Sequence, residues 1–334
     1  MTARFTLRPM IVRVAATLLL AAVAADALTA EPASGADAAA AKPIAALQIA
    51  HAERGMLLGI ARAGEQIVAV GGNGAIVRSA DGKTWRQVPS PVDTGLNAVA
   101  FADAQHGWAV GHDAVILGTA DGGATWSIQN FQPELYAPIF SILPLDAQKA
   151  IVVGAFGLIK ATDDAGATWH DVNAPELSSD KLHLNAITRL RNGQLAVAGE
   201  HGLVGVSVDG SQWRRIPTPY EGSFFGVLPW GEKGAIVFGM RGNVYVSDDP
   251  GTASWKKIEI AAPVSFFGGE ALSDGRLLLT GADSTLVILQ PDGTVASTRK
   301  LRADGNESSL TGSLKLADSE IVIGESGVAA IPGH

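Results

Sequence analysis

Ser79-Ala80-Asp81-Gly82-Lys83-Thr84-Trp85 is the stretch that decides the fold, because variants of it recur four more times along the chain. Each variant has an acidic turn with a tryptophan at its end, and the five tryptophans are 41, 43, 44 and 42 residues apart. The other variants occupy residues 119–126, 162–169, 207–213 and 247–255. A repeat of this length, built from short strands, is typical of a β-propeller blade.

A second repeated feature is a tight turn that begins with glycine and precedes each acidic turn. It occurs seven times, at residues 71–74, 111–114, 154–157, 199–202, 239–242, 281–284 and 324–327. Glycine suits tight turns because it adopts positive φ without a steric cost. Seven turns predict an all-β fold, a seven-bladed β-propeller with four-stranded antiparallel blades.

The two ends of the repeat region indicate how the ring closes. The last blade has three candidate strands, at residues 310–316, 320–323 and 328–331, before the chain stops. Residues 44–49 form a strand-like run ahead of the first blade. We therefore expect this N-terminal run to be the outer strand of the last blade, because it would cover an unpaired edge.

The first residues have the pattern of a secretory signal peptide. Arg4, Arg8 and Arg13 precede an apolar run at residues 14–25, which is too short to span a membrane. We expect a signal peptide at residues 1–27, a disordered linker at 28–43 and a single propeller domain at 44–334. The chain has no cysteine, so no disulfide is expected, and the periplasm is the expected location.

The charge of the chain limits the kinds of partner. Removal of residues 1–27 would leave 22 basic and 32 acidic residues, a net charge of about −10. This charge argues against nucleic acid or anionic lipid as the main partner.

The acidic turns with tryptophan are expected to serve the fold. The aspartate can accept hydrogen bonds from N–H groups of its own turn, and the tryptophan can pack between neighbouring blades. These structural residues are Asp81, Trp85, Asp121, Trp126, Asp164, Trp169, Asp209, Trp213, Asp249 and Trp255. They lie on the face opposite the glycine turns, and we assign them no catalytic role.

Catalytic signatures are weak. A sialidase needs an arginine cluster and a tyrosine nucleophile, yet the inner strands contain almost no arginine. Asp283 and Glu325, on equivalent turns of neighbouring blades, are either the paired carboxylates of a glycosidase or solvated turn residues. No set of three or four metal ligands and no cofactor motif is present, so neither a metal nor a cofactor is expected. The sequence favours a protein that is not an enzyme; an exported sialidase-like hydrolase or a glycan-binding propeller is the alternative.

The face that carries the glycine turns is the candidate partner-binding face. Its turns and long loops mix aromatic, apolar and charged side chains, which suits contact with a protein or peptide, although ordinary loops are also variable and polar. The candidate contact residues are His112, Asp113, Tyr136, Phe156, Glu200, His201, Tyr220, Met240, Arg241, Asp283 and Glu325.

The pattern Val-Gly-x-x-Gly-x-Ile, followed by Thr-x-Asp-Gly-Gly-x-Thr-Trp, resembles the BNR or Asp-box repeats of the Ycf48/Hcf136 family. The resemblance is best at residues 70–85, 110–126 and 153–169 and extends over residues 44–334. It implies a photosystem II assembly or stability factor that holds a nascent membrane subunit without catalysis. In a non-photosynthetic bacterium it implies an accessory to a membrane transporter, such as one of the RND type.

The resemblance also implies what the chain binds. The expected partner is a membrane or periplasmic protein, and the chain itself is expected to be a monomer. Photosynthetic members of the family have an arginine patch. Five arginines occur in the fourth and fifth blades here, at positions Arg189, Arg191, Arg214, Arg215 and Arg241.

Overall fold

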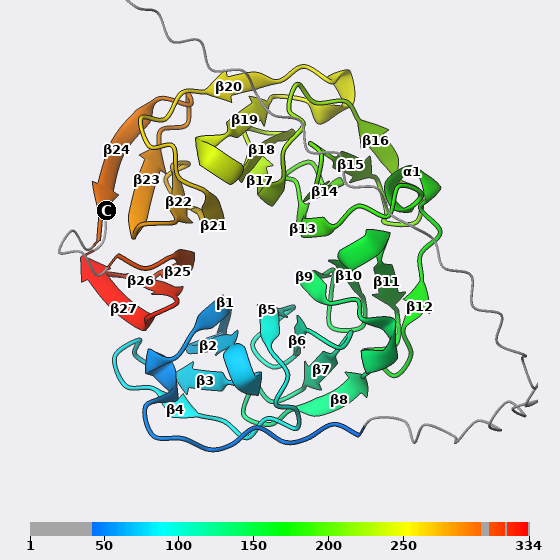
Figure 1. The fold of residues 1–334 in the computed structure, drawn as a ribbon, viewed down its shortest axis with the longest axis vertical. Helices are drawn as coiled ribbons and strands as arrows, with labels where there is room; N and C mark the ends of the chain where they lie inside the picture. Colours follow the sequence, from blue (N-terminus) through cyan, green and yellow to red (C-terminus); the bar gives the residue numbers. More distant parts are fainter. Residues whose placement is uncertain (1–41, 302–306, 318, 333–334) are drawn as a thin grey trace, which may run out of the picture. The chain divides into compact units, whose positions relative to one another are not determined.

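The computed structural model describes residues 42–301, 307–317 and 319–332. These residues form a ring of seven β-sheets around a central axis (Figure 1). The expected signal peptide and residues 28–41 of the expected linker lie outside the described residues. Among the described residues, no helix has both the length and the apolar character required to cross a membrane.

Seven blades are confirmed, and their strands follow the chain from the axis outward. Blades 1 to 3 contain β1 (Leu57–Ala63), β2 (Gln66–Gly71), β3 (Ile76–Ser79), β4 (Arg86–Gln87), β5 (Leu96–Phe101), β6 (Gly107–Gly111), β7 (Ile116–Thr119), β8 (Ser127–Asn130), β9 (Ile139–Pro144), β10 (Ala150–Gly154), β11 (Ile159–Thr162) and β12 (His170–Asp171). Blades 4 to 6 contain β13 (Leu184–Arg189), β14 (Leu195–Gly199), β15 (Val204–Ser207), β16 (Arg214–Ile216), β17 (Phe224–Trp230), β18 (Gly234–Gly239), β19 (Val244–Ser247), β20 (Lys256–Ile258), β21 (Phe266–Ala271), β22 (Leu277–Gly281), β23 (Thr285–Leu289) and β24 (Val295–Lys300). Blade 7 contains β25 (Leu310–Lys315), β26 (Ser319–Gly324) and β27 (Gly327–Pro332).

Helical segments are short and lie in the connections. They are η1 (Ala52–Arg54), η2 (Gly72–Gly74), η3 (Pro133–Leu135), η4 (Ala155–Gly157), α1 (Pro175–Ser178), η5 (Met240–Gly242) and η6 (Pro250–Thr252). We call the face with the glycine turns the upper face, and the face with the acidic turns the lower face. Inner strands start at the upper face, since the loops from each outer strand to the next blade cross it.

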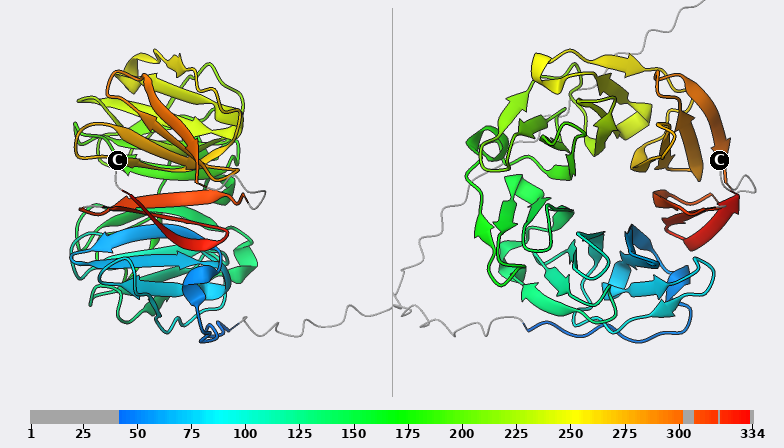
Figure 2. Two further views of the ribbon diagram at one scale, coloured as in Figure 1. Left: turned by 90° about the vertical axis from the view of Figure 1, so that its left-hand side faces the viewer. Right: turned by 180° about the vertical axis from the view of Figure 1, so that it is seen from behind.

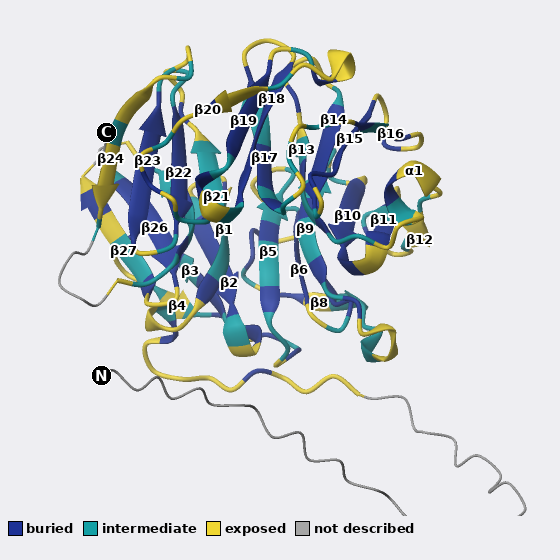
Figure 3. Cartoon of the chain, turned by 45° about the horizontal axis from the view of Figure 1, so that its top comes forward, coloured by how far each residue is buried: buried dark blue, intermediate teal, exposed yellow. Residues whose placement is uncertain are grey.

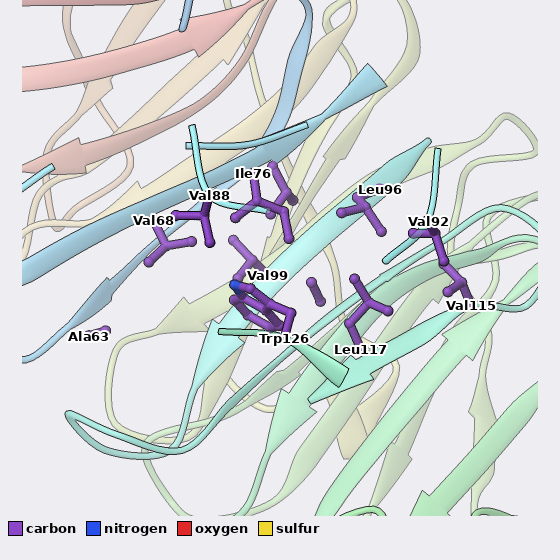
Figure 4. Packing of buried hydrophobic residues seen from close by; sticks show 12 residues of the cluster. Ala63, Val68, Ile76, Val88, Val92, Leu96, Val99, Val115, Leu117 and Trp126 are labelled. Atoms are coloured by element: carbon purple, nitrogen blue, oxygen red, sulfur yellow. The ribbon is translucent and has the colours of Figure 1, made fainter. Parts of the chain in front are cut away.

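The core consists of seven apolar clusters, one in each seam between neighbouring blades. Second and third strands are buried almost throughout, whereas outer strands are largely exposed (Figure 3). In the seam between blades 1 and 2, Trp126 packs against Val68 and Val99 (Figure 4). Burial of the indole between two blades is what the position of tryptophan in the repeat predicts.

The expected position of residues 44–49 is wrong. Blade 7 has three strands among the described residues, and residues 44–49 form no strand. They run along blade 1 instead, where the N–H of Ala46 donates to Ser90 O (3.1 Å) and the N–H of Ile49 donates to Gln87 Oε1 (2.8 Å). The alternation of apolar residues indicates an extended chain, but it does not specify which edge that chain follows.

The ring closes through side-chain hydrogen bonds between blades 7 and 1, which lie side by side (Figure 2). Thr311 Oγ1 donates to Leu57 O over 2.7 Å. At the lower end of the same seam, Arg62 donates to Lys315 O over 2.7 Å. Closure therefore depends on polar links and the apolar cluster of this seam, not on a strand shared between both ends of the chain.

The expected reason for the first glycine of each upper turn is also wrong. Gly71 and Gly239 have φ of −173° and −176°, which is extended backbone. A Cβ on Gly71 would lie 2.0 Å from Met56 O, so the chain requires glycine there because the preceding loop approaches closely. Positive φ falls on the tip residue two positions later in six turns, at Asn73, Asp113, Phe156, His201, Arg241 and Asp283.

Candidate partner-binding face

The acidic turns of the lower face are internally hydrogen-bonded. Asp81 Oδ1 accepts from the N–H groups of Lys83 (2.8 Å) and Thr84 (2.7 Å). These bonds, that of Thr84 first, lower the pKa of Asp81 to about 2. The hydroxyl and N–H of Thr168 likewise lower the pKa of Asp164 to about 2. Asp121, Asp209 and Asp249 each accept one or more N–H groups from their own turn.

The five tryptophans of these turns each precede an outer strand and lie in a seam. Trp126 and Trp213 are buried, and the other three are half-buried. Trp85, Trp126 and Trp213 donate their indole N–H to a carbonyl of their own turn. The five carboxylates and five indoles of the repeat are thus engaged in the turns and seams.

The upper face exposes aromatic side chains on blade 3. Tyr136 is 84% exposed and Phe156 is 53% exposed, and both have positive φ (47° and 56°). A bulky residue rarely adopts this backbone conformation, because it costs on the order of 1–3 kcal/mol. Two such residues with exposed rings on neighbouring loops are the features expected of a contact surface.

An aromatic path leads from this blade to the axis. The ring of His183 lies 5.1 Å from that of Phe156 and 5.6 Å from that of Phe140. Glu200 holds His183 in place, since its Oε2 accepts the backbone N–H of His183 over 2.8 Å. Phe140 in turn lines the central channel.

The mouth of the central channel is formed by the second residue of each inner strand. These residues are Leu58, Asn97, Phe140, Asn185, Phe225, Phe267 and Thr311. Asn97 and Asn185 donate to carbonyls of the next blade, so the groups left to meet a ligand at the mouth are mainly apolar. The channel has a volume of about 310 Å³.

The remaining candidates are spread around the upper face. His112, His201, Arg241, Asp283 and Glu325 are exposed, and Asp113, Glu200 and Met240 are half-buried. Tyr220 is different: its ring packs 5.1 Å from Phe224 and 5.8 Å from Tyr245, and burial raises its pKa. Tyr220 thus belongs to the seam between blades 4 and 5 more than to the surface.

The structure does not bring the arginines of blades 4 and 5 together. Arg241 lies on the upper face, whereas Arg189 is at the lower end of an inner strand. Arg214 and Arg215 lie on an outer strand, where Arg215 pairs with Asp180 (2.6 Å).

The two candidate carboxylates of a glycosidase lie on separate turns of the upper face. Asp283 is at the exposed tip of its turn, and Glu325 accepts the N–H of Ser309 over 3.0 Å. No group of three or more histidine or carboxylate side chains in the described part of the chain is placed to hold a metal ion. The aromatic path and the channel mouth were not found from the sequence, although the phenylalanines at the second position of three inner strands were a usable signal.

Comparisons with known proteins identify relatives of this propeller. The sequence model of the family described as photosynthesis system II assembly factor YCF48 matches residues 77–264. The chloroplastic photosystem II stability/assembly factor HCF136 of Cyanidioschyzon merolae is 37% identical over 76 residues, which are 21% of this chain. The matched stretch spans only 17% of that relative.

Solved structures share the fold. A structure of YCF48 bound to D1 peptide has a TM-score of 0.67 at 20% identity and covers 88% of this chain and 100% of that one. YCF48 from Cyanidioschyzon merolae has a TM-score of 0.66 at 15% identity, with 84% and 95% covered. Virginiamycin B lyase from Staphylococcus aureus, an enzyme, has a TM-score of 0.70 at 13% identity, with 85% and 97% covered. At these identities the likeness shows a common fold and no more.

Proposed function

Since this chain belongs to the photosynthesis system II assembly factor YCF48 family, we propose that it binds a segment of another protein on its upper face and supports the assembly of that protein without catalysis. The proposed partner is a membrane protein of the envelope, met in the periplasm after export. In a photosynthetic host it would be a photosystem II subunit, and in another bacterium a transporter of the RND type.

One observation carries the proposal: the path from exposed Phe156 through His183 and Phe140 to the channel mouth. Apolar side chains of an extended segment can pack along this path, since aromatic residues dominate the energetics of protein contacts. The structure of YCF48 bound to D1 peptide supports this choice, because a propeller of the same fold binds a peptide in that structure.

Photo-crosslinking tests the proposal at a defined position. A photoreactive phenylalanine analogue at Phe156 should crosslink to an integral membrane protein in native envelopes, which mass spectrometry would identify. Val208 provides the matched control, because it is 76% exposed but lies in an acidic turn of the lower face. Equal crosslinking from both positions, or from neither, would contradict the proposal.

A binding measurement then separates contact from stability. Once the partner segment is known, Phe156→Ala and Tyr136→Ala should each weaken its binding at least tenfold, whereas Val208→Ala should not. None of the three should change the melting temperature by more than a degree or two, because these side chains lie outside the seams. Hydrolysis of sialosides or aryl glycosides at enzymatic rates by the purified protein would overturn the non-catalytic assignment.

A further inference from the structure

The lower face has a recess between blades 5 and 6 that the proposed function does not use. Its volume is about 400 Å³, and its lining includes Trp230, Ser247, Asp248, Trp255, Lys256 and Asp292. This volume is within the range of small-molecule sites. The recess lies on the opposite side of the ring from the upper face.

Beside this recess, blade 6 lacks the tryptophan of the repeat. In blades 1 to 5 a tryptophan directly precedes the outer strand and packs against the preceding blade. In blade 6 the strand pairing places Ala296 at this position, because Ser297 pairs with Ile288 as Lys256 pairs with Val246 in blade 5. Alanine cannot fill the space of an indole, so the seam is less filled beside Trp230.

Two polar groups that line this recess have no partner. The indole N–H of Trp230 finds no acceptor among the described residues, whereas the other six tryptophans all donate. Ser247 is 2% exposed, and its hydroxyl also has no hydrogen-bond partner there. Buried polar groups are normally paired, so the buried hydroxyl of Ser247 requires an explanation.

The hydroxyl of Ser247 lacks a partner because of the sequence of its turn. At the equivalent positions, Ser79, Thr119, Thr162 and Ser207 each accept an N–H from a glycine of their own turn. In blade 5 the turn contains Pro250, which has no N–H, and the N–H of Gly251 donates to Asp249 Oδ1 instead (3.0 Å). Ser247 therefore keeps an unused hydroxyl at the edge of the recess.

The equivalent recess between blades 2 and 3 is an internal comparison. It has a volume of about 280 Å³ and includes Trp108 and Thr119 in its lining. There Gln129 Oε1 accepts from the indoles of Trp108 (3.0 Å) and Trp169 (3.3 Å), and Gln129 Nε2 donates to Ala165 O (2.9 Å). The polar groups of the recess between blades 2 and 3 are thus hydrogen-bonded within the chain, whereas those of the recess between blades 5 and 6 are left for a ligand.

The charges of the open recess favour a neutral ligand. Asp249 pairs with Lys233 (2.8 Å), and Asp292 accepts the N–H and the hydroxyl of Thr294. Asp248 and Lys256 add one negative and one positive charge to the same lining. A cation or an anion would therefore meet a like charge. A hydroxyl group both donates and accepts, so it can use an indole N–H, a serine oxygen and an aspartate together.

We propose that this recess binds a monosaccharide, either as a free sugar or as the end of a glycan. The C–H faces of the sugar would pack on the indoles of Trp230 and Trp255, and its hydroxyls would bond to the unpaired groups. This site is separate from the upper face and does not depend on the proposed assembly function.

Titration calorimetry and saturation-transfer NMR with glucose, galactose and N-acetylglucosamine test the proposal, together with a glycan array. Tetramethylammonium serves as a cationic probe. Trp230→Phe and Ser247→Ala should each weaken sugar binding at least tenfold or abolish it. The matched controls Trp108→Phe and Thr119→Ala, in the recess between blades 2 and 3, should bind like the parent.

The outcomes are distinct. Binding of free sugars points to a small-molecule ligand, and binding on the array alone points to a glycan end; both support the site. Failure of every sugar and glycan to bind, binding of tetramethylammonium only, or equal effects of the two sets of variants would overturn it. Crosslinking from Phe156 should be unchanged in Trp230→Phe, so failure of one proposal does not imply failure of the other.

Discussion

Blades 2 and 7 show two ways of holding a blade in the ring. Blade 2 has four strands, an acidic turn and Trp126, which packs against blade 1. Blade 7 has three strands among the described residues and no such turn; polar links join it to its neighbours through Thr311, Ser313 and Lys315. We infer that apolar seams tolerate changes of pH, whereas the seam between blades 6 and 7, which contains Glu270 and Glu320, responds to them.

The largest effect on the free energy of unfolding is expected in the apolar seam between blades 1 and 2. Trp126→Ala should lower the free energy of unfolding by about 3–5 kcal/mol, the usual result of emptying a buried aromatic site. Chemical denaturation at pH 7 measures it. Val208→Ala, at an exposed position, should change the value by no more than about 0.5 kcal/mol. Similar values for the two variants would show that the tryptophan does not hold the seam.

The next effect comes from the seam between blades 6 and 7, where Glu320 is fully buried. Burial, followed by the nearby carboxylate of Glu270, raises the pKa of Glu320 to about 7. Ser313 and Lys315 donate to Glu270, and burial raises the pKa of Glu270 as well. Lys315 and Arg299 favour the charged form of Glu320, but less strongly.

A raised pKa in the folded state means that the folded protein binds the proton more tightly than the unfolded chain. The stabilisation is complete below the unfolded pKa near 4.5 and is lost as pH rises through about 7, up to about 3 kcal/mol in total. Denaturation at pH 5, 6, 7 and 8 should show this loss in the parent and a clearly smaller loss in Glu320→Gln, where Glu270 remains. The exposed control Glu259→Gln should keep the parent's slope, and a flat parent profile would contradict the prediction.

A smaller effect is expected where the ring closes. Thr311→Val removes the hydroxyl that donates to Leu57 O, and it should lower the free energy of unfolding by about 1 kcal/mol. Hydrogen exchange should become faster in β25–β27 and in β1. The same exchange rates in the variant and the parent would show that this bond does not hold the two blades together.

The smallest effect is expected at the N-terminal segment. Removal of residues up to 49 takes away bonds to Ser90 and Gln87 on blade 1 and exposes no edge of blade 7. The free energy of unfolding should change by no more than about 0.5 kcal/mol. Size-exclusion chromatography should still show a single species. Aggregation after this truncation would instead indicate that the segment covers the edge of blade 7.

The sequence was sufficient to predict the blades but not the contacts between them. Regular spacing of tryptophan and glycine predicts seven sheets, because each repeat must bury the same faces. Spacing does not predict the edge that Ile44 to Ile49 follows, since an extended segment pairs equally well with several partners. Glu320 begins a candidate strand in the sequence, and nothing in the pattern shows that its side chain is fully buried.

The two candidate sites differ in how clearly the sequence indicated them. The upper face followed from the glycine turns, but Tyr220 was assigned to the surface because no pattern places its ring beside Tyr245. The recess between blades 5 and 6 was missed. Its signals were present, in Ala296 at the place of a tryptophan and in Pro250 within an acidic turn.

The hydrogen bond from Thr311 to Leu57 also has a kinetic consequence, because the two residues are 254 positions apart in the chain. Blades 1 to 6 form from contacts between near neighbours in sequence, so they can fold in order as the chain is synthesised. Closure must wait for blade 7, and contacts over such long separations form slowly. We therefore expect a slow final refolding phase for this protein, and we expect unfolding to begin by separation of blade 7 from blade 1.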